Sequence, residues 1–158
     1  KFNLFFRITK KQTLMNIEEL INACEIFKKN KTGALFVIER SNSLDFVRNT
    51  GDQLNLEIST PIIESIFFKN SPLHDGAVII EGNFITGARV ILPMSENEDI
   101  DSRLGLRHRA AFGITEKTDA IAIVVSEEKG KITFIKNGEI QPYQNIENLK
   151  TMIEVEMT

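Results

Sequence analysis

Three runs of consecutive apolar residues, each as long as a β-strand, constrain the fold of this chain more than any other feature. They are Ala34–Ile38, Ala77–Ile80 and Ala120–Val125. A strand with one solvent-exposed face alternates apolar and polar residues, so unbroken apolar runs of this length favour strands that are buried on both faces. Burial on both faces requires other elements above and below the sheet, and helices are the usual cover.

Residues 16–30 have the periodicity of an amphipathic helix. Asn16 and Glu19 stand three residues apart at its start, which is the arrangement of a capping box. Apolar side chains then recur at helical spacing, namely Ile17, Leu20, Ile21, Cys24 and Phe27. The pattern predicts a helix with one buried stripe, and it makes Cys24 a core residue rather than a nucleophile.

Helix and strand signals alternate along the rest of the chain. Ser59 or Thr60 followed by Pro61 is typical of a helix start, and Ser102 precedes another helical segment. The predicted helices cover residues 16–30, 62–68, 102–114 and 146–157, and further strands are predicted over residues 53–58, 84–92 and 131–135. This order predicts an α/β fold in which helices flank a central mixed β-sheet on both faces.

Composition limits the classes of function. The 158 residues suit a single domain, and 42% hydrophobic with 26% charged residues is typical of a globular protein. The net charge of −3 creates no general field that would attract nucleic acid. Any polyanionic ligand must therefore be held by a local cluster of positive groups. The single cysteine leaves no internal disulfide to form, which is typical of a reducing compartment.

The first eleven residues differ from the rest of the chain. They combine bulky apolar groups with four cations and contain no acidic residue. This mixture suits a segment just cytoplasmic of a membrane helix, and it suits equally an amphipathic strand or helix docked on the domain. We therefore divide the chain into a basic, apolar juxtamembrane-like segment over residues 1–15 and a folded domain over residues 16–158. The start at Lys1 rather than Met indicates a piece of a longer protein.

Most familiar nucleotide and hydrolase motifs are absent from the sequence, but one candidate lies at residues 71–77, directly before a buried strand. There, Asp75 offers a carboxylate, and Gly76 lets the backbone approach a ligand closely. Magnesium and manganese prefer such oxygen ligands, usually one or two carboxylates together with phosphate oxygens. The alternative is that Asp75-Gly76 is only a turn, which is the commonest use of this dipeptide.

A second candidate is the run Arg107-His108-Arg109 in a predicted helical turn. Arginine side chains and a helix N-terminus both bind phosphate. Consecutive helical positions diverge by about 100°, so the three side chains do not all face one ligand, and we expect one arginine to point inward to a carboxylate. The alternative is a solvated basic face paired with acidic residues of the preceding segment: Glu96, Glu98, Asp99 or Asp101.

Glu127 and Glu128 provide a further source of carboxylates at the end of the strand predicted over residues 120–125. In open α/β sheets, ligands gather at the carboxyl ends of strands. The alternative here is an ordinary charged turn.

Together these segments resemble the diadenylate cyclase family, in particular its membrane-anchored bacterial class. The residues that carry the resemblance are His74-Asp-Gly-Ala77 and Arg107-His-Arg109, which match the D-G-A and R-H-R motifs of the family. Residues 33–40, 92–95 and 125–128 also resemble family blocks, so that most of the chain from residue 17 to residue 149 is covered. The resemblance implies the cytoplasmic catalytic domain of a membrane-anchored protein, with the anchor outside this chain.

The resemblance further implies condensation of two ATP molecules into cyclic di-AMP with release of two pyrophosphates. One domain binds one ATP, so a face-to-face homodimer is implied. Asp75 would bind a divalent metal (magnesium, manganese or cobalt) and help to activate a ribose hydroxyl. Glu127 or Glu128 would complete the metal shell.

The nucleotide itself is implied to contact residues of both motifs. Gly76 and Ala77 would lie against it, and Arg107, His108 and Arg109 would hold its triphosphate. Leu106 also belongs to this set, and it stands where many family members carry threonine. The missing hydroxyl leaves a second hypothesis open, that of an ATP-binding regulatory module with weakened catalysis. A third hypothesis is a structural interaction domain with an incidental basic turn.

Overall fold

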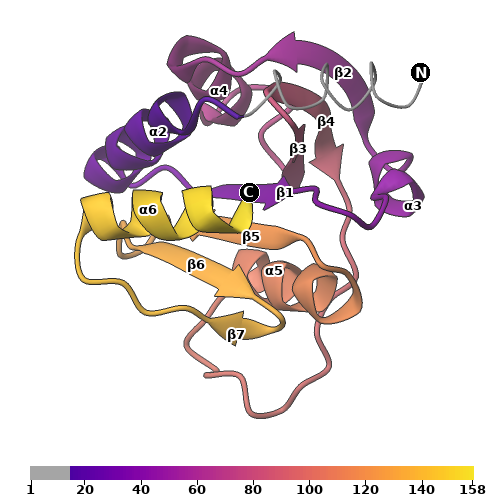
Figure 1. Cartoon of the computed structure of the whole chain (residues 1–158), viewed down its shortest axis with the longest axis vertical. Coiled ribbons are helices and arrows are strands. Elements are labelled where there is room, and N and C mark those ends of the chain that lie inside the picture. Colours follow the sequence, from indigo (N-terminus) through magenta and orange to yellow (C-terminus); the bar gives the residue numbers. More distant parts are fainter. Residues whose placement is uncertain (1–14) are drawn as a thin grey trace.

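The computed structural model describes residues 15–158, which form one seven-stranded sheet with helices on both faces (Figure 1). The strands, in sheet order, are β2 (Asp52–Glu57), β4 (Phe84–Val90), β3 (Ala77–Glu81), β1 (Ala34–Ile38), β5 (Ile121–Val125), β6 (Ile132–Lys136) and β7 (Glu139–Ile140). The helices are α2 (Ile17–Asn30), α3 (Asp45–Arg48), α4 (Thr60–Phe67), α5 (Leu106–Lys117) and α6 (Ile146–Glu156).

The strand directions confirm the predicted mixed sheet. β1 and β3 run parallel, whereas the other neighbouring strands pair antiparallel. The three apolar runs form β1, β3 and β5, which occupy the centre of the sheet. The sequence did not predict β7, because a two-residue exposed strand carries no apolar pattern and depends on pairing with β6.

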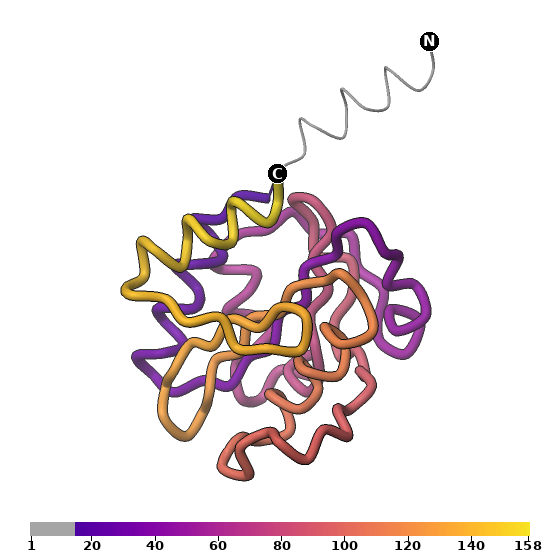
Figure 2. The backbone as a smooth tube through the Cα atoms, turned by 60° about the horizontal axis from the view of Figure 1, so that its bottom comes forward, coloured from indigo at the N-terminus to yellow at the C-terminus, as the bar shows by residue number. Residues whose placement is uncertain are grey.

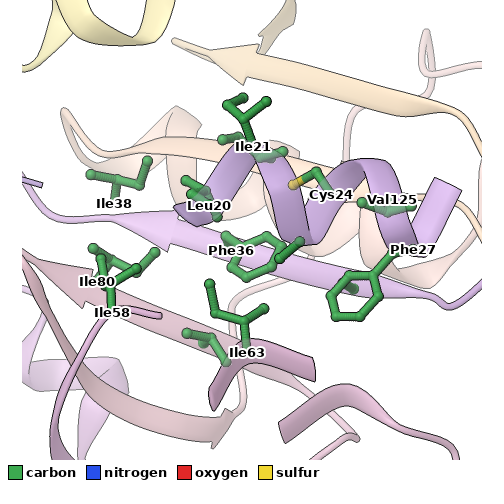
Figure 3. Close-up of a cluster of buried hydrophobic side chains, with 14 of the residues drawn as sticks. Leu20, Ile21, Cys24, Phe27, Phe36, Ile38, Ile58, Ile63, Ile80 and Val125 are labelled. Carbon is green, nitrogen blue, oxygen red and sulfur yellow. The ribbon is translucent and has the colours of Figure 1, made fainter. Parts of the chain in front are cut away.

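Alternate residues of the central strands enter two separate cores. Phe36 and Ile38 of β1 belong to the core under α2, α4 and α6, which Figure 3 shows in part. Leu35 and Val37 belong to the core under α3 and α5. The unbroken apolar runs thus have the predicted cause, namely helices on both faces of the sheet. Figures 1 and 2 show the C-terminal helix α6 lying beside α2 over the first core.

The start of α2 differs from the predicted capping box. The side chain of Asn16 makes no capping hydrogen bond. Instead, the Glu19 carboxylate accepts hydrogen bonds from the backbone N–H of Thr60, at 2.6 Å, and from its hydroxyl, at 2.5 Å. Glu19 therefore ties α2 to the start of α4. Cys24 is fully buried within α2, which confirms its assignment to the core.

The start of α4 matches the sequence analysis, whereas the start of α5 does not. The Ser59 hydroxyl caps α4 by accepting from the backbone N–H of Ile62, and Pro61 lies in the first turn. α5 begins at Leu106 after Gly105, rather than at Ser102. The reason is local, since the Asp101 carboxylate accepts from the backbone N–H and the guanidinium of Arg103, and these bonds form a turn before the helix.

The mixed sheet gathers several strand ends at one edge. Ala34 at the start of β1 pairs with Val125 at the end of β5, and Val125 in turn pairs with Ile132 at the start of β6. The start of β3 lies at the same edge, because β3 runs parallel to β1. The segment between β4 and α5 projects at one end of the molecule (Figures 1 and 2).

The predicted juxtamembrane-like segment over residues 1–15 lies, apart from Met15, outside the described residues, so the boundary after residue 15 stays a prediction. Among residues 15–158, none of the helices combines the length and the apolar character that crossing a membrane requires.

Candidate active site

A cleft of about 1000 Å³ opens at the sheet edge where the strand ends meet. It brings together nearly all the residues that the sequence singles out, although these residues come from three separate parts of the chain. Its lining includes Asp75, Gly76, Ala77, Leu106, Arg107, His108, Glu127 and Glu128. Arg109 is the one predicted site residue that is not part of this lining.

The backbone at Asp75-Gly76 is held by packing against β4, which an ordinary surface turn would not require. Asp75 is exposed and directly precedes Gly76, whose φ of +117° is a conformation that other residues rarely adopt. A Cβ atom on Gly76 would lie 2.9 Å from the Cα of Arg89, so glycine is also required for close packing against β4. The preceding loop is held by a 2.6 Å hydrogen bond between the His74 ring Nδ1 and the carbonyl oxygen of Ser71.

Arg107, the second residue of α5, reaches across the cleft edge. Its Nη1 lies 3.6 Å from Oε1 of Glu127, which is the contact between an arginine and a carboxylate that the sequence predicted. The guanidinium also lies directly over Gly33, where an added Cβ would be 2.5 Å from Nη1. The Glu127 side chain is 65% exposed, and an exposed pair of this kind contributes at most about 1 kcal/mol. The pair therefore costs little to separate, and Arg107 can turn to another anionic partner in the cleft.

His108 is buried beside this arginine, with 7% of its surface exposed. Burial lowers the pKa of His108 from its ordinary value of 6.5, and the positive charges of Lys131 and Arg107 add to the shift. The imidazole is therefore uncharged at neutral pH. The motif Arg107-His108-Arg109 therefore carries two positive charges at neutral pH, those of its arginines, and not three.

Arg109 lies two residues beyond Arg107 on the helix, about 200° around the axis. Its backbone carbonyl accepts a hydrogen bond from the N–H of Ser95 on the projecting segment. This placement agrees with the expectation that the motif's side chains do not all face one ligand. A phosphate contact by Arg109 stays a prediction.

Sequence reasoning missed further cations of the cleft, namely Arg103, Lys129 and Lys131. The available signal was the position of both lysines within three residues after Glu128. The alternative interpretation, in which the basic motif pairs with an acidic residue of the preceding segment, does not hold for Asp101, which binds Arg103. Hydrogen bonds from the side chain and backbone of Arg103 lower the pKa of Asp101 to about 2, and the charge of Lys129 contributes.

The cleft also has an apolar rim, of which the sequence analysis identified only Leu106. Leu106 is 74% exposed, Ile91 is 69% exposed and Met94 is 42% exposed, and all three line the cleft. Ile91 and Met94 lie just beyond β4, and Leu106 is the first residue of α5. Exposed apolar groups grouped around a cleft favour contact with a planar ligand or with another protein surface.

The carboxylates of the cleft determine how a metal ion could be held. Within residues 15–158, no group of three or more potential ligands among histidine, cysteine, aspartate and glutamate is preformed. Magnesium and manganese usually bind one or two carboxylates and complete their shell with water and phosphate oxygens. Asp75, Glu127 and Glu128 all line the cleft, and binding of a metal ion by Asp75 with either glutamate stays a prediction.

Comparison with known proteins identifies the family. The family model described as DisA bacterial checkpoint controller nucleotide-binding (DAC) matches residues 21–140. The chain is 44% identical to the cyclic di-AMP synthase CdaA of Bacillus subtilis over 140 residues, covering 89% of this chain and 51% of that protein. It is 44% identical to the diadenylate cyclase CdaS of Bacillus thuringiensis over 119 residues, covering 75% of this chain and 59% of that protein. The chain thus spans little more than half the length of these curated relatives.

Solved structures support the same relationship. A double mutant of DacA from Staphylococcus aureus superposes with a TM-score of 0.86 at 35% identity, covering 89% of this chain and 94% of that one. A hypothetical membrane spanning protein from Bacillus cereus gives a TM-score of 0.76 at 43% identity, covering 78% and 60% of the two chains. The fold, the two motifs and the match over residues 21–140 lead to one conclusion, that this chain belongs to the DAC family, together with the diadenylate cyclases that it resembles.

Proposed function

We propose that this chain is the catalytic domain of a diadenylate cyclase, which condenses two ATP molecules into cyclic di-AMP and two pyrophosphates. The observation that carries the proposal is the meeting of Asp75 and Arg107 in one cleft, although they lie on different elements. A carboxylate and an arginine facing one space are what a phosphoryl-transfer site needs. The relatives named as diadenylate cyclases support the same reaction.

The reaction consists of two equivalent displacements. In each, the 3′-oxygen of one ATP attacks the α-phosphorus of the other and forms a new P–O bond. The bond between the α-phosphorus and the bridging oxygen of the β-phosphate breaks, and pyrophosphate leaves. The hydroxyl proton passes to solvent beside the negative charge of Asp75. Such displacements depend mainly on alignment and charge neutralisation.

The cleft residues divide these tasks among them. Arg107 and Lys131 neutralise triphosphate charge, and the neutral His108 donates a hydrogen bond to a phosphate oxygen. Asp75 orients the attacking hydroxyl, and with Glu127 or Glu128 it would hold a divalent ion. A magnesium, manganese or cobalt ion bound with the nucleotide would add positive charge at the phosphates. Gly76, Ala77 and the apolar rim at Leu106 would lie against the nucleoside.

A second copy of the chain completes the site. One cleft offers one Asp75 and one Arg107, whereas the product contains two equivalent linkages. Two clefts facing each other across a two-fold axis supply both sets. The exposed apolar rim, with Leu106 and Ile91, would be covered when the two copies meet.

We further propose that the domain is cytoplasmic and anchored to the membrane through a segment outside this chain. The basic residues at the start of the sequence suit the cytoplasmic side of a membrane. The similar Bacillus cereus chain is named as a hypothetical membrane spanning protein, which supports the same location.

The direct test is a product assay with purified protein, ATP and either magnesium or manganese. The wild type should form cyclic di-AMP, and Asp75→Asn should abolish product formation because it removes the carboxylate charge. Glu18→Gln is the matched control, since it removes a surface carboxylate that pairs with Lys150, away from the cleft. Binding of ATP without product under every metal would contradict the enzyme and support the regulatory module suggested by Leu106. If Leu106→Thr then gained activity, the loss would be traced to that residue.

A further inference from the structure

The backbone of β4 has an unusual conformation at Arg89, next to the Asp75 motif. Ala77 pairs with Val90, and Ile79 pairs with Gly87. Between these pairs β4 advances by three residues and β3 by two, so β4 contains a bulge. Arg89 lies within it, with a φ of +53°. Positive φ in a bulge normally belongs to glycine, and an arginine in this conformation is strained.

Two glycines approach the backbone of Arg89 from the strands on either side of β4. A Cβ on Gly51, before β2, would lie 2.9 Å from the carbonyl carbon of Arg89 and 2.3 Å from the carbonyl oxygen of Ala88. A Cβ on Gly76, before β3, would lie 2.8 Å from the same Arg89 carbonyl carbon. β4 lies between β2 and β3 in the sheet, so the backbones at Gly51 and Gly76 pack closely against the bulge from both sides. Its shape therefore sets the position of Gly76.

The side chain of Arg89 is held outside the cleft. Its Nε donates to Oδ2 of Asp52 at 2.6 Å, and its Nη2 donates to Oδ1 at 3.3 Å, which is a two-pronged ion pair. The backbone N–H of Ile91, just after the bulge, donates to the Thr50 hydroxyl at 2.8 Å. Neither Asp52 nor Arg89 belongs to the cleft lining, whereas Asp75, Gly76 and Ile91 do.

We propose that Asp52 and Arg89 are positioning residues for Asp75. The ion pair holds Arg89 in its strained conformation, the resulting bulge supports Gly76, and Gly76 places the carboxylate of Asp75 in the cleft. This inference rests on the proposed function, because it assigns to Asp75 the task of holding the divalent ion that accompanies ATP. Neither Asp52 nor Arg89 contacts the nucleotide itself.

The test is calorimetric titration with 3′-deoxy-ATP, which lacks the attacking hydroxyl and does not react, with and without manganese. In the wild type, manganese should tighten binding of this analogue. Asp52→Ala leaves the bulge without its ion pair, whose two side chains are 49% and 40% exposed. Such a pair is worth about 1 kcal/mol, so the manganese effect should fall about fivefold in Asp52→Ala. Affinity without metal should change less than about twofold, because Arg107 is untouched.

A second substitution separates positioning from a general loss of structure. Glycine adopts positive φ without strain, so adding Arg89→Gly to Asp52→Ala should restore the bulge without the ion pair. The double variant should regain most of the manganese effect. Glu18→Ala, which removes the surface carboxylate paired with Lys150, is the control and should behave as the wild type.

The titrations with and without manganese have three outcomes that contradict the positioning role of Asp52 and Arg89. An unchanged manganese effect in Asp52→Ala, no recovery in the double variant, or no manganese effect in the wild type would overturn the inference. Wild-type protein that binds the analogue with manganese but forms no cyclic di-AMP would instead contradict the proposed reaction, while the binding comparison still tests the positioning pair.

Discussion

At the scale of single residues, the contact between Gly33 and Arg107 shows how the start of a strand helps to position the Arg107 guanidinium in the cleft. Gly33 directly precedes β1, and the absence of a side chain there leaves room for the guanidinium. The sequence showed Gly33 only as a boundary before a strand and as part of a block that resembles the family. Its contact with Arg107 depends on how α5 packs against the sheet. Because the two residues are far apart in the sequence, no local sequence pattern could predict this contact.

Gly33→Ala should displace Arg107 without unfolding the protein. The added methyl would lie 2.5 Å from Nη1, but this atom is the end of a flexible side chain and can move. We expect the melting temperature to stay near that of the wild type. Loss of one hydrogen bond to a charged group costs about 1.5 kcal/mol, so the KM for ATP should rise roughly tenfold.

Steady-state kinetics of both single variants and their combination check this prediction. If the glycine acts through Arg107, Gly33→Ala should add little once Arg107→Ala is present. Additive losses in the double variant would show that Gly33 affects the cleft by another route.

The titration of His108 leads to a prediction about acid stability. Burial and nearby positive charges lower the pKa of His108 in the folded state below its ordinary value of 6.5. As the pH falls through 6.5, the unfolded chain takes up this proton first, so protonation favours unfolding. The contribution of His108 is thus fully present above pH 6.5 and is lost as the pH drops toward the folded-state pKa.

His108→Gln should therefore flatten the decline of stability between pH 7 and pH 5. Urea unfolding of wild type and variant at several pH values measures the difference in slope. Other groups contribute equally to both proteins, so the difference isolates the histidine. Identical slopes would mean that His108 does not titrate differently in the folded and unfolded states.

At the scale of elements, α5 carries the second motif and depends on a close fit against the segment after β4. A Cβ on Gly113 would lie 1.8 Å from the carbonyl oxygen of Pro93. The position of α5 is therefore determined by close contact between its backbone and the backbone at Pro93. Because α5 carries both Arg107 and His108, its position determines where these two residues lie in the cleft.

Gly113→Ala sets two effects against each other. Alanine favours a helix over glycine by about 1 kcal/mol. The new methyl would overlap a backbone oxygen, and overpacking of this kind costs about 1 to 3 kcal/mol or more. We expect the overlap to dominate, with a lower urea midpoint and weaker ATP binding. A variant more stable than the wild type would show that α5 can shift freely.

The elements also show where sequence patterns succeed and where they fail. The central strands were predicted because burial on both faces leaves unbroken apolar runs. The start of α5 was misplaced, since Ser102 resembles a helix cap, while hydrogen bonds between Asp101 and Arg103 form a turn there instead. The bulge at Arg89 has no local signal, because the ion pair with Asp52 and the close approach of Gly51 and Gly76 involve residues that are distant in the sequence.

At the scale of the whole molecule, strand direction decides where the site forms. Sequence reasoning placed Glu127 and Glu128 at the carboxyl end of β5 and Asp75 directly before β3, and the structure places them there. The start of β1 lies at the same edge, because β1 runs parallel to β3 and antiparallel to β5. Strand order and direction follow from long-range pairing, so the motifs could be predicted from the sequence, whereas the edge at which they meet could not.

We propose that one chain provides half of a site that joins two ATP molecules. The most direct measurement is the specific activity of cyclic di-AMP formation over a wide range of protein concentration, with the oligomeric state followed by light scattering. Specific activity should rise with concentration as dimers form, and it should level off once they are saturated. Specific activity that stays constant at concentrations where only monomers are present would contradict the claim.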